Sequence, residues 1–550
     1  MTEKKSGFSR QHREVDMAYI IDSSRCVGCG ACAYECLFGV PQPVDTEKSR
    51  YHIDREKCAG CGQCAAICPN GAILPDFTQR KIKNVTIDRD KCIGCSMCSR
   101  VCKAGAAHGE IKEPFEIDQK KCFRCGQCAL KCPKGAINVE YEEPEEVKGG
   151  FSMYRLYCRI FQAVMKVANY FLGYRMPEYI EGPGSIKKLP QMLKEKGAGK
   201  VLVVTDNGLM KLGLPEGLFA ALEEEGVEYA VYSDVNPNPT SDNVEAGFKI
   251  YRENGCQAIV AMGGGSPMDC AKGIGAKAAH PKKTVAQLQG ILKVHKKIPL
   301  FFAIPTTAGT GSETTVAAVI TDSATHHKAS INDPSILPKY AVLDPELTMG
   351  LPPFITSTTG LDALAHAVEA YTNHTYNTPL ENDLSKKAVR LIYDNLLKAY
   401  HDGSDLEARQ NMQKAAFFAG RAFTRGCVGY VHAVGHTLGG LYGVAHGKAM
   451  SILLPHVMRE FGSKAHKRLA ELADVCGMEG KNDAEKADKF IRWIEDMKKE
   501  MDIPEYVDMI KDEDVEQIIA WAMKEANPLY PVPVIWKHDE LARFIARIRA

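Results

Sequence analysis

Sixteen of the 21 cysteines fall into four short runs before residue 140, and each run has the spacing C-x2-C-x2-C-x3-C. The runs are Cys26, Cys29, Cys32 and Cys36; Cys58, Cys61, Cys64 and Cys68; Cys92, Cys95, Cys98 and Cys102; and Cys122, Cys125, Cys128 and Cys132. Soft thiolates at every third residue can surround an iron–sulfur cluster, and small residues such as Gly28 and Gly30 let the backbone close around it. Zinc sites, the alternative, normally use two separated C-x2-C pairs, so the spacing favours iron–sulfur chemistry.

A second group of chemical residues lies in two apolar stretches, GLDALAHAVEA (360–370) and GYVHAVGHTLGGLYGVAHGKAMSILLPH (429–456). Asp362 and His366 are four residues apart and share one helical face, as do His432 and His436, and His446 follows ten residues later. Imidazoles with a carboxylate suit Fe(II) or Zn(II). Any one of these histidines alone would be a packed or surface residue, but their combination predicts a divalent metal site.

A glycine turn predicts a site for a dinucleotide. The strand-like run AIVAM (258–262) is followed at once by GGGSPMDCAKGIGA. Gly263, Gly264 and Gly265 leave room for close backbone approach, Ser266 is a good N-cap, and Asp269 follows three residues after it. A helix N-terminus after such a turn offers free N–H groups to a pyrophosphate. An ordinary strand–helix turn is the alternative, because it can have the same sequence.

Two further features support the prediction of a dinucleotide-binding site. The run LFFAIPTTAGTGSE (300–313) predicts a second strand and a loop that carries Thr306, Thr307 and Thr310. Asp206 ends the strand-like VLVVTD (201–206), where it would accept the adenosine ribose hydroxyls and repel a 2′-phosphate. The pattern therefore favours NAD over NADP.

The elements that must position these residues follow from the change of pattern along the chain. IDREKCAGCGQCAAICPNGAI (53–73) recurs as IDQKKCFRCGQCALKCPKGAI (117–137), so the eight-cysteine unit is duplicated. Strands and helices alternate from about residue 178, and the chain is helical after about 345. The predicted fold class is multidomain, with α+β ferredoxin-like iron–sulfur modules, an α/β dinucleotide-binding domain and an all-α metal-binding domain. The predicted divisions are a tail (1–18), two modules (19–80 and 81–140), a linker (141–177), an NAD-binding domain (178–345) and a catalytic domain (346–550).

The linker contains the stretch FSMYRLYCRIFQAVMKVANYFLG (151–173), which predicts an amphipathic helix. Leu156, Ile160, Val164, Val167 and Phe171 recur at helical spacing, with basic residues elsewhere on the turn. Such a helix could bind a membrane surface or a partner, but packing against its own domains is the simpler reading. Cys158 within it reads as a small buried apolar residue.

Composition excludes several classes of function. A formal net charge of +1 gives no electrostatic reason for binding nucleic acid. The N-terminal stretch lacks a signal-peptide core, and no segment has about eighteen uncharged apolar residues in a row, so we expect no transmembrane segment. Many cysteines in a reducing compartment indicate metal or redox ligation rather than disulfides, and we expect a cytoplasmic protein.

Two family resemblances follow from these motifs. The cysteine-rich part resembles bacterial two-cluster ferredoxins, in which the fourth cysteine of each run ligates the other cluster. The resemblance implies four [4Fe–4S] clusters, held by Cys26, Cys29, Cys32 and Cys68; by Cys58, Cys61, Cys64 and Cys36; by Cys92, Cys95, Cys98 and Cys132; and by Cys122, Cys125, Cys128 and Cys102. Proline follows the fourth cysteine at Pro69 and Pro133, but Leu37 and Lys103 stand in the other two runs.

The stretches VVTD, NPNPTSDNVEAG, GGGSPMDCAK, IPTTAGTGSE, GLDALAHAVEA and HGKAMSILLPH resemble the iron-containing (group III) alcohol dehydrogenase family over about residues 178–550. The resemblance implies an active site between the two domains, a homo-oligomer, and a metal held by Asp362, His366, His432 and His446. His436 would relay a proton or orient the metal ligands. The chain departs from the family at Thr437, Arg425 and Cys427. If Arg425 faces the cleft it would pair with an anionic substrate, and a solvated surface arginine is the alternative.

The expected activity is an NAD(H)-linked alcohol dehydrogenase or aldehyde reductase with a small alcohol or aldehyde as substrate. A cluster carries one electron whereas NAD accepts a hydride, and nothing in the sequence resembles a flavin site that would join the two. We therefore expect the four-cluster module to exchange electrons with a ferredoxin or flavoprotein partner. Two alternatives stay open: the module docks the enzyme onto a larger redox complex, or the dehydrogenase part is a scaffold for an electron-transfer protein.

Overall fold

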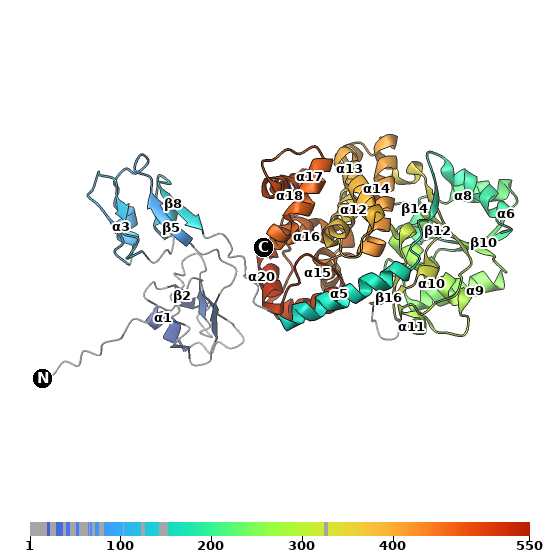
Figure 1. Cartoon of the computed structure of the whole chain (residues 1–550), viewed down its shortest axis with the longest axis horizontal. Helices are drawn as coiled ribbons and strands as arrows, with labels where there is room; N and C mark the ends of the chain where they lie inside the picture. Colours follow the sequence, from blue (N-terminus) through green and yellow to red (C-terminus); the bar gives the residue numbers. More distant parts are fainter. Residues whose placement is uncertain are drawn as a thin grey trace. The chain divides into compact units, whose positions relative to one another are not determined.

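The computed structural model describes residues 19–21, 29–36, 40–43, 51–53, 64, 67–68, 72–75, 82–102, 104–122, 127–141, 152–323 and 328–549. The chain divides into two compact units, Met1–Gly150 and Phe151–Ala550 (Figure 1). Four of the predicted cluster ligands, Cys26, Cys58, Cys61 and Cys125, lie outside the described residues. Among the helices that the structure describes, none has the length and apolar content needed to cross a membrane.

The described residues of the first unit form short strands and single-turn helices in two series with the same strand pairing. The first series is β1 (Tyr19–Ile21), α1 (Ala31–Glu35), β2 (Pro41–Pro43), β3 (Tyr51–Ile53) and β4 (Ile73–Pro75). The second series is β5 (Ile82–Ile87), α3 (Met97–Val101), β6 (Ala107–His108), β7 (Glu116–Ile117), α4 (Gln127–Lys131) and β8 (Ile137–Tyr141). In both series the first strand pairs antiparallel with the last and the two middle strands pair with each other. The repeated sequence therefore has a repeated fold.

A six-stranded parallel sheet forms the first part of the second unit. Its strands, in spatial order, are β11 (Glu228–Tyr232), β10 (Lys200–Val204), β12 (Ala258–Gly263), β14 (Leu300–Pro305), β17 (Tyr340–Leu343) and β9 (Glu178–Glu181). The chain leaves β10 toward β11 on one side and then continues through β12, β14 and β17 on the other. A crevice forms at the carboxyl ends of strands where the order reverses in this way, so the ends of β10 and β12 are where a dinucleotide is expected to bind.

The sheet is buried on both faces because its strands are continuously apolar. Leu202 and Val204 of β10 belong to the core on one face, with residues of α9 and α10, and Val201 and Val203 belong to the core on the other, with residues of α6 and α8. The helices of this domain are α6 (Leu189–Glu195), α7 (Asn207–Lys211), α8 (Glu216–Glu224), α9 (Ser241–Glu253), α10 (Gly265–Ala279) and α11 (Val285–Leu288). A small sheet of β13 (Gly290–Ile291), β16 (Lys328–Asn332) and β15 (Ala317–Thr321) completes it.

The rest of the second unit is helical, as predicted. It contains α12 (Pro353–Asn373), α13 (Pro379–His401), α14 (Leu406–Gly426), α15 (Tyr430–Tyr442), α16 (His446–Phe461), α17 (Ser463–Val475), α18 (Asp483–Glu500), α19 (Val515–Ala526) and α20 (His538–Ile548). A Cβ atom on Gly420 of α14 would lie 2.7 Å from the carbonyl oxygen of Gly311 in the loop after β14. Two glycines without side chains thus let the α/β and helical domains meet backbone to backbone.

The predicted amphipathic helix is α5 (Met153–Phe171), which belongs to the second unit and lies along its outside, beside α20 at its amino-terminal end (Figure 1). It packs against its own unit, as the simpler reading predicted, and Cys158 is fully buried. The face that it buries is the opposite of the expected one. Arg155 bonds to Glu540 and to the carbonyl of Ile535, whereas the apolar residues point outward.

Candidate metal and dinucleotide sites

Four side chains with metal-binding donors converge in the helical domain from three helices. Asp362 and His366 lie one turn apart on α12, His432 lies on α15, and His446 begins α16. One donor atom of each lies within 4.8 Å of the other three. The Nε2 atoms of His446, His432 and His366 lie 3.3, 3.7 and 4.0 Å from Oδ1 of Asp362. The structure thus brings together the four residues that the sequence suggests as ligands.

Gly447 explains how His446 reaches the other three residues. A Cβ atom at this position would lie 2.5 Å from the carbonyl oxygen of Thr358 in α12. Because no side chain fits there, the first turn of α16 lies directly against α12. The imidazole of His446 is therefore held beside Asp362.

These donors fit a divalent cation. Among the described residues, Oδ1 of Asp362 and Nε2 of His432 are buried without a hydrogen-bond partner, a condition that costs about 1–3 kcal/mol for each group. The donor atoms, all within 4.8 Å of one another, are near enough for a single cation to be bound by all four side chains. Asp362, His366 and His432 are buried, whereas the side chain of His446 is 43% exposed, so the site opens on the His446 side.

Neighbouring groups keep nitrogen atoms of the imidazoles available to bind a metal. Oε2 of Glu369 lies 2.6 Å from Nδ1 of His432, which leaves Nε2 of that ring free for a metal, and Oε1 of Glu369 accepts from the N–H of Val431 at 2.8 Å. Burial lowers the pKa of His366 to about 3, so this imidazole is neutral and able to bind a cation. Burial opposes ionisation of Asp362, but the adjacent imidazoles outweigh it and hold its pKa well below the usual range.

His436 lies beside the four donors, with its ring centroid 5.2 Å from that of His446. Its Nδ1 donates to Oε1 of Glu525 on α19 at 2.7 Å, and the hydroxyl of Tyr530 donates to the same oxygen at 3.2 Å. This arrangement leaves Nε2 of His436 as an acceptor in the neutral ring. Glu369 could have been found from the sequence, because it lies three residues after the predicted ligand His366. Glu525 could not, because it lies 89 residues from His436 in the sequence.

The predicted glycine turn connects β12 to α10. Gly263 has φ of +152°, and a Cβ atom there would lie 2.6 Å from Cγ of Pro267, so glycine is required. The prediction that Ser266 is the N-cap is wrong: α10 begins at Gly265, the cap is Gly264, and the hydroxyl of Ser266 donates to the carbonyl of Pro237 instead. Because glycine offers no capping side chain, the first N–H groups of this long helix are left for an anion.

The loop after β14 lies against this turn. The N–H of Thr306 donates to the carbonyl of Gly263 at 3.2 Å, although the side chain of Thr306 is buried. Cγ2 of Thr310 lies 3.1 Å from the position of a Cβ atom on Gly265, and Oγ1 of Thr307 lies 3.5 Å from that of Gly264. The side chains of Thr307 and Thr310 therefore border the turn, and Thr306 contributes through its backbone.

Asp269 has a different role from the predicted contact with the cofactor. Its two carboxylate oxygens accept from the hydroxyl of Ser312 at 3.0 Å and from the N–H of Val319 at 2.9 Å. The adjacent Lys272, not predicted from the sequence, donates to Oγ of Ser312 at 2.9 Å and to Oγ1 of Thr315 at 2.7 Å. Burial lowers the pKa of Lys272 to about 8. These two residues hold the second loop in place because α10 carries both of them on one face.

Asp206 lies two residues after the end of β10, at the switch point of the sheet. It is the N-cap of α7, and Oδ1 accepts from the N–H of Leu209 at 3.0 Å. The cap fixes the orientation of the carboxylate. Asp206 and the glycine turn therefore follow the carboxyl ends of two neighbouring parallel strands, β10 and β12.

The side chain of Arg425 is engaged by neighbouring groups of the protein. Its Nε donates to the carbonyl of Tyr376 at 2.9 Å, and its guanidinium lies 5.4 Å from the ring centroid of Tyr174. Glu381 lies 4.0 Å from the same nitrogen. The guanidinium is held among these groups by packing and a hydrogen bond, and the side chain is only 12% exposed, so the alternative of a solvated surface arginine is wrong.

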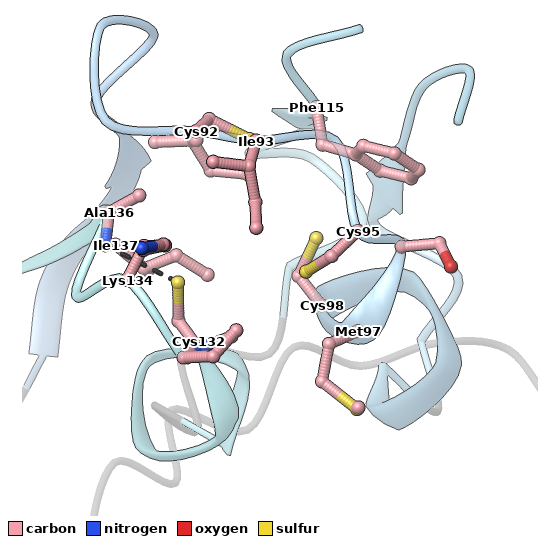
Figure 2. Close-up of a pocket in the computed structure, with 13 residues that line it drawn as sticks. Cys92, Ile93, Cys95, Met97, Cys98, Phe115, Cys132, Lys134, Ala136 and Ile137 are labelled. Atoms are coloured by element: carbon pink, nitrogen blue, oxygen red, sulfur yellow. Dashed lines mark hydrogen bonds between the residues drawn. The ribbon is translucent and has the colours of Figure 1, made fainter. Parts of the chain in front are cut away.

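A cavity in the first unit brings cysteines of two different runs together. It is lined by Cys92, Cys95 and Cys98 of the third run and by Cys132 of the fourth, with Phe115 and Ile137 among its apolar walls. Figure 2 shows these cysteine side chains around one hollow. This is the grouping that the resemblance to two-cluster ferredoxins implies for one cluster.

The fourth cysteine of each run is held in the same way. The sulfurs of Cys36, Cys68, Cys102 and Cys132 each accept a hydrogen bond from the N–H four residues later, at 3.5, 3.3, 3.2 and 3.3 Å. The contact is present whether proline, leucine or lysine follows the cysteine. Such bonds stabilise a thiolate that ligates a cluster and influence its potential.

Comparison with known families agrees with this architecture. The profile described as iron-containing alcohol dehydrogenase matches residues 177–345, and the C-terminal profile of the Fe-containing alcohol dehydrogenase family matches residues 356–547. Profiles of 4Fe-4S dicluster domains match residues 18–69, 44–106 and 91–137. The second of these spans the boundary predicted between the two modules.

Individual relatives cover the second unit. The chain is 39% identical over 369 residues to alcohol dehydrogenase 4 of Schizosaccharomyces pombe, which is 66% of this chain and 85% of that protein. It is 38% identical over 368 residues to 1,3-propanediol dehydrogenase of Klebsiella pneumoniae, or 65% and 95% of the two chains. A crystal structure of 1,3-propanediol oxidoreductase superposes with a TM-score of 0.66 at 36% identity, covering 69% of this chain and all of that one. The chain therefore belongs to the iron-containing alcohol dehydrogenase family and carries 4Fe-4S dicluster domains at its N-terminal end.

Proposed function

We propose that this chain reduces a short aldehyde to its primary alcohol with NADH, at a divalent cation held by Asp362, His366, His432 and His446. The observation that carries the proposal is the convergence of these four donors, two of them buried and unpaired, beside the pair of His436 and Glu525. The substrate class is suggested by relatives named 1,3-propanediol, methanol and butanol dehydrogenases. We favour Fe(II) over Zn(II) because the chain is rich in predicted iron–sulfur ligands.

A cation at this site supplies Lewis-acid polarisation of the substrate oxygen. The chain contributes the other functions of the site. His436 exchanges a proton with the substrate oxygen through Nε2, while Glu525 holds its Nδ1–H and stabilises the imidazolium that forms. The N–H groups at the start of α10 bind the pyrophosphate, and Asp206 accepts the ribose hydroxyls.

The iron–sulfur part has a separate role in this proposal. One cluster is held by Cys92, Cys95, Cys98 and Cys132, and the repeated runs hold three more. Clusters transfer single electrons, so we infer that they exchange them with a ferredoxin or flavoprotein partner rather than directly with NAD(H). The intact donor set argues against the dehydrogenase part being only a scaffold. Use of the iron–sulfur part as a docking element is the second candidate, and it predicts clusters that need not be reduced during turnover.

The test uses the full chain, purified anaerobically and loaded with Fe(II). We expect NADH to support reduction of propanal, and NADPH to support a rate at least about tenfold lower because of Asp206. In a second arm the clusters are reduced with dithionite, the excess dithionite is removed by anaerobic desalting, and the protein is mixed with NAD and no other protein. We expect the clusters to stay reduced and no NADH to form. Absence of NADH-dependent reduction would overturn the proposed activity, and NADH formation from the clusters would overturn the separate role of the two parts.

Glu525 should affect turnover rather than substrate binding. In Glu525→Gln the amide oxygen still accepts from Nδ1 of His436, but the negative charge that stabilises the imidazolium is lost. We expect kcat to fall about ten- to a hundredfold with little change in KM, and Glu525→Asp to recover part of the loss. The matched control is Glu516→Gln on the same helix, α19. It removes the charge from an exposed pair of the same 2.7 Å length, that of Glu516 with His538 of α20. If Glu525→Gln and Glu516→Gln changed kcat equally, the role of Glu525 in proton transfer would be contradicted.

A further inference from the structure

One side of α5 is apolar and exposed along its whole length. Eight large apolar residues, each more than a third exposed, lie on it. They are Met153, Leu156, Tyr157, Ile160, Val164, Val167, Tyr170 and Phe171. At about 200 Å² for a side chain of this size, they leave on the order of 1,000 Å² of apolar surface, well above the few hundred that an isolated protein usually exposes. A surface of this kind marks a binding site.

The exposed residues have the spacing of a coiled-coil seam. Met153, Tyr157, Ile160, Val164, Val167 and Phe171 are separated by four, three, four, three and four residues. Alternating steps of three and four place apolar side chains in one stripe that interlocks with the same stripe of another helix. The spacing therefore indicates a helix as the partner, rather than a strand or a flat surface.

The helix cannot turn this face inward because polar bonds fix its other side. The guanidinium of Arg155 donates to both carboxylate oxygens of Glu540 at 2.6 Å. Arg159 donates to the carbonyls of Val532 and Pro533 at 2.9 Å, and Gln162, itself buried, donates to those of Pro528 and Tyr530. Rotating α5 would leave these groups buried without partners, which costs about 1–3 kcal/mol each and more for the charged ones.

The residue types of α5 also limit which kinds of partner the seam can bind. Within α5, the cations Arg155 and Arg159 are engaged on the inner side, and Lys166 is the remaining charged residue. A helix that binds an anionic membrane surface normally carries several free lysines or arginines beside its apolar face. An uncharged seam is instead self-complementary, which is the condition for the same patch to serve both sides of a twofold interface.

We infer that α5 is a dimerisation helix whose seam packs against the α5 seam of a second copy of this chain. The surface available on each side matches the roughly 800 Å² per partner that a stable interface buries. Because α5 precedes residue 177, where the match to the dehydrogenase family begins, this interface is an addition to the family fold. The inference does not depend on the proposed activity.

The test measures the mass of the full anaerobic chain, with its clusters intact, by sedimentation over a range of concentrations. Val164→Glu places an unpaired carboxylate in the middle of the seam, and we expect the dimer dissociation constant to rise at least about a hundredfold. The matched control is Lys166→Glu, which puts the same carboxylate two residues along the same helix but off the seam. We expect this control to keep the wild-type mass.

Mixing variants identifies the partner of the seam. Parallel helices place Val164 opposite Val164 of the second copy, and antiparallel helices place it opposite Ile160. We therefore expect a dimer to return either when Val164→Glu is mixed with Val164→Lys or when it is mixed with Ile160→Lys. Normal iron content and NADH oxidation of each variant show that it is folded.

Several results would overturn the inference. One is an unchanged mass of the Val164→Glu variant, and another is failure of both mixtures to restore the dimer. An unchanged mass with a larger radius of gyration would show that the seam binds the iron–sulfur unit of its own chain. Loss of binding to phosphatidylglycerol vesicles, again at unchanged mass, would show that it binds a membrane.

Discussion

The Asp362→Asn variant is expected to lose the cation of the dehydrogenase site and with it nearly all aldehyde reduction. Asp362 is the only carboxylate among the four donors, and its Oδ1 lies within 4.0 Å of all three imidazoles. Removing one partner of a buried charge pair costs about 3–5 kcal/mol, or two to more than three orders of magnitude in cation affinity. Asparagine has nearly the same shape, so the fold should survive.

Zinc makes the measurement independent of the cluster iron. After chelator treatment and dialysis against Zn(II), we expect about one zinc per chain in the wild type and almost none in Asp362→Asn. The matched control is Asp405→Asn in the same domain, because Asp405 is the N-cap of α14 and asparagine caps a helix equally well. Retention of full zinc binding by Asp362→Asn would remove Asp362 from the metal site.

The parts of the site that could be predicted from the sequence are those encoded by local spacing. Asp362 and His366 lie one turn apart on α12, and the glycine turn of residues 263–265 directly follows a buried strand. Residues three or four apart share a helical face whatever the rest of the chain does, so such pairs can be recognised without a structure. The α/β domain and the helical domain were predicted from the change of pattern along the chain.

The features that were missed or wrongly predicted are those that tertiary contacts determine. Glu525 contacts His436 from another helix, so no local spacing in the sequence could predict this hydrogen bond. Ser266 has the chemistry of an N-cap, but the preceding glycines allow α10 to start earlier. The orientation of α5 could not be predicted because an amphipathic pattern gives two faces without saying which one the protein buries. Arg155 and Arg159 find partners in the C-terminal segment, and these partners fix the orientation.

Two double variants are expected to separate the possible ligand sets of the second pair of clusters. Cys132 lines the same cavity as Cys92, Cys95 and Cys98, although it belongs to the following run. If these four hold one cluster, Cys98→Ala with Cys132→Ala removes two ligands of the same cluster, and the chain should lose about four irons. Cys128→Ala with Cys132→Ala then removes one ligand from each of two clusters, and the loss should be about eight.

Ligation within single runs predicts the reverse order, because Cys128 and Cys132 would then share a cluster and Cys98 and Cys132 would not. Each double variant contains Cys132→Ala and a second cysteine change, so general damage to the unit affects both alike. Iron and sulfide analysis on the anaerobic protein gives the counts, and NADH-dependent aldehyde reduction gives the control. That activity should stay at the wild-type level in both variants, because the clusters lie in Met1–Gly150 and the dehydrogenase residues in Phe151–Ala550, two separate compact units. Loss of activity in step with the clusters would instead show that electrons pass between the units during turnover.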